Sequence, residues 1–239
     1  MSVELSKDDT ESVPLVPWDE FVPRFKWAQG EHVGLIGPTG AGKTNMAFWL
    51  LPMRTYVTVL ATKPKDTSLD KFGKRNGYKV LREWTKATAK QIPRRILWPN
   101  ARSLNADIEQ QRVFTEALGS IFVQGGWCVY IDELWYVGTV LNMTRIVKKY
   151  LQQARSTGIS LVVSSQRPAW IPVEVYDQST HLFFWRENDE RNLSRISGIG
   201  WLSAKLIQHT VARLPKYHVL YVNTRTGEMM ITRPPKPKD

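Results

Sequence analysis

The sequence predicts an α/β fold in which a mainly parallel sheet is flanked by helices and ends in an antiparallel β-hairpin. Three observations lead to this fold class. Short apolar runs alternate along the chain with segments whose apolar residues recur every three or four positions, as in strands and helices. A glycine-rich loop joins one apolar run to the helical pattern after it. Two strand-like runs near the C-terminal end flank a Thr-Gly turn, which indicates the hairpin.

The elements follow one another in a regular order. Aromatic and basic residues alternate over 21–27, which predicts an edge strand or packing beside an adenine ring. Residues 61–102 read as irregular and basic apart from two short strands. The predicted strands span 33–36, 56–60, 78–81, 95–98, 127–131, 159–163 and 181–185, the helices span 45–51, 107–123 and 142–154, and the hairpin comprises 217–222 and 228–232.

Length and composition indicate one folded domain with two short appendages. The chain has 239 residues, of which 42% are hydrophobic, enough for a packed core. We expect a flexible acidic arm over residues 1–20, a single domain over 21–232 and an extended tail rich in proline and lysine over 233–239.

The sequence shows no sign of secretion or membrane insertion. Cys128 is the single cysteine, so an internal disulfide is excluded and a reducing compartment is expected. No apolar run reaches the ~20 residues that a membrane helix needs. The first 20 residues carry one Lys and six acidic residues, unlike a signal peptide. We therefore expect a cytoplasmic protein.

The glycine-rich loop fits the P-loop pattern, Gly-x-x-x-x-Gly-Lys-Thr. Its glycines let successive backbone N–H groups surround phosphate oxygens, and the helix that follows adds its positive N-terminal end. Lys43 is expected to reach the β- and γ-phosphates, and Thr44 to bind Mg²⁺. The sequence thus predicts ATP and Mg²⁺ as cofactors. The expected nucleotide-binding residues are Gly37, Pro38, Thr39, Gly40, Ala41, Gly42, Lys43, Thr44 and Asn45.

Two adjacent carboxylates end the apolar run 127–131, where a Walker B pair belongs. Asp132 is expected to hold Mg²⁺, directly or through water. Glu133 is expected to orient and deprotonate the attacking water. The alternative is that Asp-Glu only begins a surface turn. The upstream P-loop favours the Walker B pair over such a turn. A glutamate at this position favours a hydrolase that drives motion over a small-molecule kinase.

Two further polar residues lie near the predicted strand 159–163. Gln166 follows it, where a side-chain amide can contact both the γ-phosphate and water. Arg155 ends the preceding helix and could act as an arginine finger that completes a neighbouring subunit's site. Each also has an ordinary explanation, because polar residues are common at strand ends and helix C-termini favour basic residues.

Positive charge is concentrated in one stretch. The chain carries +11 overall, and residues 63–102 contain twelve Lys and Arg against three Asp and Glu, a net charge of +9. Such a surface attracts nucleic acid through its phosphates, without sequence preference. An ordinary solvated, lysine-rich face is the alternative. The candidate DNA contacts are Lys71, Lys74, Arg75, Lys79, Arg145, Lys148 and Lys149, with Trp135 and Tyr136 as pore-facing candidates.

Residues 152–168 (QQARSTGISLVVSSQRP) resemble the block that follows Walker B in HerA/FtsK-type ATPases. Four motifs match in order over about 34–168: P-loop, Asp-Glu, Ala-Arg-x-x-Gly, and a strand followed by Gln-Arg-Pro. The resemblance implies a RecA-like (ASCE) P-loop NTPase fold, Arg155 as a trans-acting finger and Gln166 as a phosphate sensor. It also implies a homo-oligomeric ring of five or six subunits around double-stranded DNA.

The chain departs from larger members of that group. It is too short for the membrane and DNA-orienting domains of chromosome translocases, and nothing in it resembles a terminase nuclease. These departures favour a compact viral genome-packaging ATPase acting in the host cytoplasm, docked on a portal or vertex of the capsid. The match fades after Pro168, so pore residues are not carried over from the family.

Two alternatives remain open at this level. One is a non-packaging ATPase that transfers DNA for a plasmid or mobile element, which the sequence does not separate from packaging. The other is a P-loop nucleotide kinase or GTPase. The guanine-reading motif fails because position 65 is Lys65 where Asp is required. A kinase lid could be formed by Arg186, Arg191 and Arg195.

Overall fold

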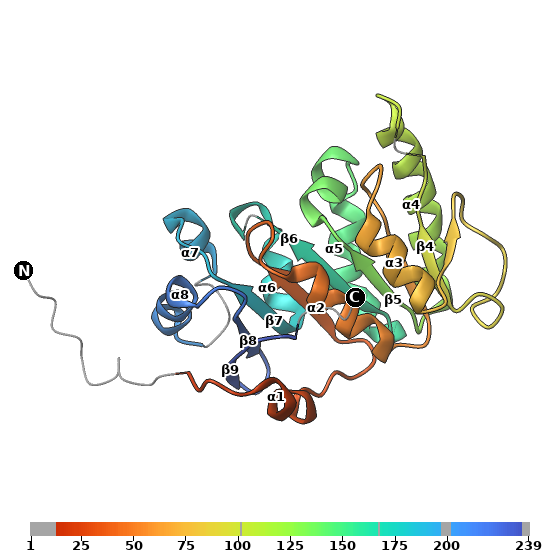
Figure 1. Cartoon of the computed structure of the whole chain (residues 1–239). Coiled ribbons are helices and arrows are strands. Elements are labelled where there is room, and N and C mark those ends of the chain that lie inside the picture. Colours follow the sequence, from red (N-terminus) through yellow and green to blue (C-terminus); the bar gives the residue numbers. More distant parts are fainter. Residues whose placement is uncertain (1–12, 101, 167, 197–201, 236–239) are drawn as a thin grey trace, which may run out of the picture.

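A single mixed sheet organises the fold (Figure 1). The computed structural model describes residues 13–100, 102–166, 168–196 and 202–235. In this part of the chain, nine strands pair in the order β3-β4-β2-β5-β6-β1-β7-β8-β9. The sheet is parallel from β3 through β7, and β8 and β9 add an antiparallel hairpin. The strands are β1 His32–Ile36, β2 Val57–Leu60, β3 Lys79–Leu81, β4 Arg94–Leu97, β5 Cys128–Ile131, β6 Ser160–Ser165, β7 Ser179–Trp185, β8 Val219–Asn223 and β9 Met229–Thr232.

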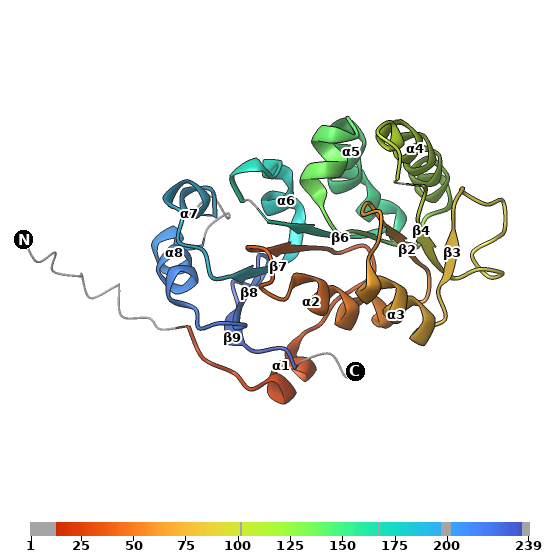
Figure 2. The ribbon, with the colours of Figure 1, turned by 45° about the horizontal axis from the view of Figure 1, so that its top comes forward.

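Helices cover both faces of the sheet, as Figure 2 shows. One face carries α1, α2 and α3, and the other carries α4, α5 and α6, with α7 and α8 beside the β7–β9 end. The helices are α1 Trp18–Arg24, α2 Lys43–Leu50, α3 Thr67–Arg75, α4 Ala106–Gln124, α5 Thr144–Gln153, α6 Val173–Gln178, α7 Glu190–Ile196 and α8 Ala204–Arg213. Among these helices, none combines the length and apolar character needed to cross a membrane.

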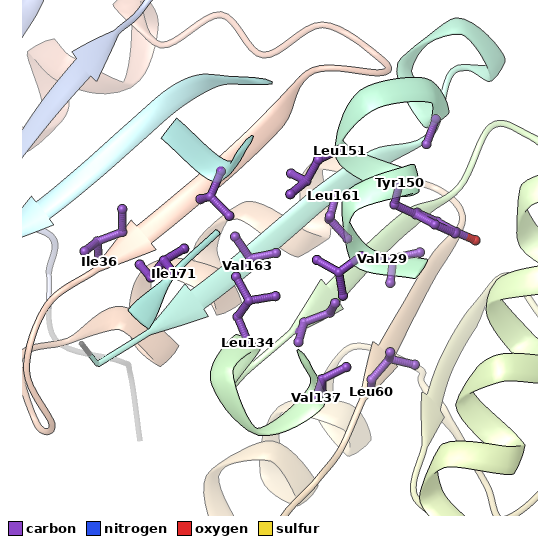
Figure 3. Close-up of a cluster of buried hydrophobic side chains, with 14 of the residues drawn as sticks. Ile36, Leu60, Val129, Leu134, Val137, Tyr150, Leu151, Leu161, Val163 and Ile171 are labelled. Carbon is purple, nitrogen blue, oxygen red and sulfur yellow. The ribbon is translucent and has the colours of Figure 1, made fainter. Parts of the chain in front are cut away.

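The sheet separates two hydrophobic cores because successive side chains in a strand point to opposite faces. Within β6, Leu161 and Val163 pack into the core under α4, α5 and α6, whereas Val162 packs into the core under α1, α2 and α3. Figure 3 shows Leu161 and Val163 near Val129 of β5 and Leu151 of α5. Strands buried on both faces read as continuous apolar runs, which confirms the interpretation of 127–131 and 159–163.

The predicted edge strand at 21–27 is wrong, because α1 occupies part of this segment. The aromatic residues are spaced for a helix rather than a strand: Phe21 and Phe25 stack with ring centroids 5.7 Å apart. Phe21 also meets Trp49 of α2 at 6.3 Å and Phe183 of β7 at 6.2 Å. Burying this aromatic cluster against the sheet favours the helix over an extended edge.

The region 61–102, which was predicted to be irregular apart from two strands, also contains a helix, α3. Its start is defined by Asp66, whose Oδ1 accepts a hydrogen bond from the backbone N–H of Leu69 at 2.9 Å. Its apolar residues Leu69 and Phe72 are buried against α2, where Phe72 stacks on Phe48 at 4.1 Å. The two short strands predicted within the region are confirmed as β3 and β4.

The described part of the predicted N-terminal arm lies against β9. The backbone N–H of Val16 donates to Ile231 O, and that of Ile231 donates to Pro14 O, each at 2.8 Å. Val16 is also buried. The predicted boundary at residue 20 therefore shifts toward the N-terminus. The rest of the arm, residues 1–12, and the end of the tail, 236–239, lie outside the described residues.

Candidate nucleotide site

The P-loop curves between β1 and α2 and encloses the Lys43 side chain. The Lys43 ammonium donates to Gly37 O at 2.6 Å and to Pro38 O at 2.9 Å. Gly40 and Gly42 have φ of 75° and 117°, a left-handed backbone that glycine adopts without strain. Burial lowers the pKa of Lys43 to about 8, although the Glu133 and Asp132 carboxylates oppose the shift. A phosphate would restore the charge by supplying oxygens to this ammonium.

Asp132 follows β5, and one oxygen of its carboxylate contacts two hydroxyl groups. Its Oδ1 accepts a hydrogen bond from the Tyr130 hydroxyl at 2.7 Å and lies 3.4 Å from Thr44 Oγ1. A hydroxyl and a carboxylate side by side are oxygen ligands that suit Mg²⁺, which usually takes few protein ligands and completes its shell with phosphates and water. No group of three or more His, Cys, Asp or Glu among the described residues could hold a metal by itself.

Lys63, a member of the basic stretch 63–102, is a further residue of the site. It follows β2, and its ammonium donates to Asp132 Oδ2 at 2.6 Å, with Asp66 Oδ2 at 3.5 Å. Burial lowers the pKa of Lys63, but the two carboxylates outweigh it and raise the pKa overall. The Trp98 indole N–H donates to Lys63 O at 2.7 Å and holds its backbone. Lys63 thus competes for the carboxylate that is expected to hold Mg²⁺.

Glu133 and Gln166 lie together between the P-loop and the ends of β5 and β6. Burial raises the pKa of Glu133; the Lys43 charge and a hydrogen bond with Gln166 oppose this shift, and the Asp132 charge adds to it. Gln166 Oε1 also accepts a hydrogen bond from Thr39 Oγ1 at 2.6 Å. A carboxylate with a raised pKa is a better proton acceptor, and Gln166 connects it to the P-loop.

Arg155 does not lie at this site. It belongs to a 3₁₀ turn, Ala154–Thr157, that precedes β6, whereas the P-loop follows β1 at the other end of the parallel strands. The two edges are separated by the length of β6, roughly 20 Å for six residues. The Arg155 side chain is exposed, and within the described part of the chain it has neither a hydrogen bond nor an ion pair.

The DNA-contact candidates fall into two groups on opposite faces of the sheet. The first group lies on α3 and β3, and the second lies on α5. In the second group Lys148 pairs with Glu174 at 2.8 Å, and Lys149 lies 4.7 Å from the Phe122 ring centre. The first group comprises Lys71, Lys74, Arg75 and Lys79, and the second group comprises Arg145, Lys148 and Lys149.

Part of the positive charge in 63–102 serves the fold. Arg95 is fully buried and donates to the carbonyls of Ala87, Thr88 and Ile92. Arg94 donates to Asn76 O at 3.0 Å. The net charge of the stretch therefore overstates the charge available to a partner. Arg167, from the Gln-Arg-Pro motif, lies outside the described residues.

Comparison with known proteins relates the chain to viral DNA-packaging ATPases. The DNA packaging ATPase P9 of enterobacteria phage PRD1 is 25% identical over 211 residues, covering 85% of this chain and 87% of P9. The DNA-packaging ATPase B204 of Sulfolobus turreted icosahedral virus superposes with a TM-score of 0.63 at 17% identity, covering 87% of this chain and all of B204 (100%). No protein-family model matches the chain.

A second solved structure shares this fold. The genome packaging NTPase B204 of Sulfolobus turreted icosahedral virus 2, in complex with ATPγS, matches with a TM-score of 0.59 and 16% identity. The match covers 87% of this chain and 98% of the B204 chain. The chain is thus homologous to P9 and has the P-loop NTPase fold of B204, which confirms the predicted fold class.

The ion pair between Lys63 and Asp132 gives a testable prediction. Lys63→Met keeps the aliphatic stem and removes the competing charge, so Mg²⁺ should bind more readily. We expect the Mg²⁺ concentration that half-saturates nucleotide binding to fall about fivefold, the size of a partly exposed ion pair. Mg²⁺ titration with a fluorescent ATP analogue measures this. Lys65→Met is the matched control, and unchanged or weaker Mg²⁺ binding in Lys63→Met would contradict the prediction.

Proposed function

We propose that this chain, a homologue of the PRD1 packaging ATPase, is an ATP-driven double-stranded DNA translocase that packages a viral genome. The observation that carries the proposal is similarity to P9 over 85% of a chain that has both a P-loop and the Asp132-Glu133 pair. This similarity favours packaging over transfer of a plasmid or mobile element. It gives no support to a nucleotide kinase or a GTPase.

Each residue of the site has a distinct part in ATP hydrolysis. The P-loop N–H groups and Lys43 bind the phosphates, and Thr44 and Asp132 would hold Mg²⁺, which neutralises phosphate charge when bound. Glu133 accepts the proton of the attacking water. Gln166, already joined to Thr39 and Glu133, is placed to respond to the γ-phosphate and position the water.

Substitutions of Glu133 and Lys43 should distinguish ATP hydrolysis from ATP binding. Glu133→Gln should bind ATP normally but hydrolyse it about 10²- to 10⁴-fold more slowly, because it loses the general base. Lys43→Ala should weaken binding itself. Equilibrium binding of a fluorescent ATP analogue and steady-state phosphate release measure the two effects. Full turnover by Glu133→Gln would assign the base elsewhere.

The proposed active form is a homo-oligomeric ring of five or six subunits around DNA. Arg155 supports it, because this exposed cation lies at the opposite edge of the sheet from its own P-loop and is available to a neighbour. An arginine supplied in trans stabilises charge on the transferred phosphoryl group. The ring would act in the host cytoplasm, docked on the portal or vertex of a capsid.

Mixing two inactive variants tests the shared site. Arg155→Ala should bind ATP yet lose about 10³-fold in turnover, as expected for loss of an arginine finger. Mixed with Lys43→Ala, it should recover hydrolysis, because some interfaces then join an intact P-loop to an intact Arg155. Phosphate release across mixing ratios measures the recovery. No recovery despite demonstrated co-assembly would rule out action in trans.

Binding of duplex DNA should be insensitive to sequence and steeply dependent on salt. Each neutralised phosphate contact changes the slope of log affinity against log salt by about 0.9. Replacing Lys71, Lys74, Arg75 and Lys79 by Ala should therefore flatten the slope by about three to four if α3 and β3 carry the contacts. Fluorescence anisotropy at several salt concentrations measures it, and the same titration on Arg145, Lys148 and Lys149 tests α5. A control variant carries Lys205→Ala and Lys216→Ala. If this control and the α3–β3 variant give equal slopes, the basic residues of α3 and β3 form only a solvated surface.

A further inference from the structure

Three loops meet at the edge of the sheet opposite the P-loop, and one side chain joins them. The loops are residues 28–31 before β1, residues 125–127 before β5 and residues 154–159 before β6. The Gln29 side-chain amide in the first loop donates to Gly126 O at 3.2 Å and to Gly158 O at 2.6 Å. We propose that Gln29 is a positioning residue that holds Arg155 in place for the neighbouring subunit's active site, an inference that rests on the proposed ring.

The loop that carries Gln29 is a tight turn with a defined backbone. The Glu31 N–H donates to Ala28 O at 3.2 Å, and Gly30 has φ of 87°, as the third position of a type II turn requires. The Glu31 side chain closes the turn a second time, because its Oε2 accepts a hydrogen bond from the Ala28 N–H at 2.8 Å. Gln29, at the corner of this turn, therefore extends from a fixed backbone.

Glu31 also ties the turn to β7 and β8. Its carboxylate is buried, which is costly unless hydrogen bonds compensate. It accepts hydrogen bonds from His181 Nε2 and from Arg225 Nη1, each at 3.0 Å. A carboxylate only accepts, so Nε2 carries the His181 proton and the Tyr221 hydroxyl donates to Nδ1 at 2.9 Å. The turn is thus held without Gln29, and a change at Gln29 should affect only what its amide contacts.

Gly158 and Gly30 connect the Gln29 turn to Arg155. Gly158 follows the 3₁₀ turn 154–157, and its N–H donates to Arg155 O at 3.0 Å. The Gly30 N–H donates to Ser160 Oγ at 3.0 Å, which fixes the turn to the start of β6. A Cβ atom at Gly30 would lie 3.5 Å from Arg155 Cγ, so the same turn lies against the aliphatic part of the Arg155 side chain.

Arg155 depends on this support because its own guanidinium has none. Within the described part of the chain, the guanidinium has neither a hydrogen bond nor an ion pair. Its direction is therefore determined by the backbone turn that carries it and by the loop beneath. A misplacement of about 1 Å can lower a rate about 10²-fold. The P-loop lies at the other edge of the sheet, so loss of Gln29 should reduce turnover and leave nucleotide binding intact.

Gln29→Glu tests the inference with the least change of shape. The variant keeps the size of the side chain but loses both donors. Gln29 is exposed, so the carboxylate can turn to water, and the melting temperature should fall by no more than about 4 °C. We expect turnover to fall about 10- to 100-fold and ATP affinity to change less than about twofold. Phosphate release and binding of a fluorescent ATP analogue measure the two effects.

Two further variants separate lost hydrogen bonds from added charge. Gln29→Ala removes the same hydrogen bonds without a charge and should lower turnover similarly. Gln178→Glu is the matched control, because Gln178 is exposed and ends α6 directly before β7, at the same edge of the sheet. It adds the same charge and should retain full turnover. A loss in Gln29→Glu that Gln29→Ala does not share would overturn the inference.

Mixing experiments separate the positioning of Arg155 from general damage to the subunit. Mixed with Lys43→Ala, Gln29→Glu should recover phosphate release well above the sum of the two separate activities. The reason is that Lys43→Ala subunits supply a correctly placed Arg155 to an intact P-loop. Mixed with Arg155→Ala, it should not recover, because every subunit then lacks Arg155 or misplaces it. A purely structural defect would not follow this pattern, and light scattering verifies co-assembly.

The outcomes distinguish this inference from the proposed function. Suppose that the mixture of Arg155→Ala and Lys43→Ala recovers hydrolysis, so that the shared site stands. Full turnover by Gln29→Glu, recovery with Arg155→Ala, or no recovery with Lys43→Ala would then show that Gln29 does not position Arg155. If Arg155→Ala and Lys43→Ala do not recover despite co-assembly, the shared site fails and the role of Gln29 fails with it.

Discussion

The parallel pairing of β1, β6 and β5 is the constraint on which the site depends. The register aligns Ile36 of β1 with Ser165 of β6, and Ile131 of β5 with Val163 of β6. All three strands therefore end at the same edge, and the residues that follow them meet there. The Gly37 backbone N–H donates to Ser165 O at 3.1 Å, which fixes the start of the P-loop next to Gln166. A slip of one residue would turn alternate side chains to the wrong face and separate these groups.

The sequence could predict the parts of the site that are contiguous in the chain. The P-loop is one segment, and Asp132 and Glu133 directly follow a strand, so local pattern suffices. Lys63 was missed because its contact with Asp132 requires β2 to lie beside β5, and neighbour order is not encoded in a local motif. The cavity beside Ala41 and Gly42 of the P-loop could not be predicted for the same reason, because Trp185, Tyr217 and Arg233, which line it, come from three distant segments.

Local sequence patterns were also misleading where the same pattern fits two different structures. The aromatic residues of 21–27 alternate with basic ones, a pattern that resembles a strand, but Phe21 packs in a cluster with Trp49 and lies in a helix. In the basic stretch, composition concealed α3, although Asp66 followed by Leu69 and Phe72 carries the signal of a capped amphipathic helix. The net charge of residues 63–102 is misleading in a similar way, because Arg95 is a core residue whose guanidinium donates hydrogen bonds to backbone carbonyls.

The contact between Gly30 and the Arg155 turn has a mechanical consequence. Gly30 precedes β1 with φ of 87°, and a Cβ atom there would lie 2.9 Å from Arg155 O, so no larger residue fits. The backbone that begins β1 thus abuts the turn that carries Arg155, while the same strand leads into the P-loop at its far end. In the proposed ring, each β1–β6 pair would form a rigid connection between two successive active sites, with the P-loop at one end and Arg155 at the other. A shift at one site would then be transmitted to the next by the sheet itself, without an intervening hinge.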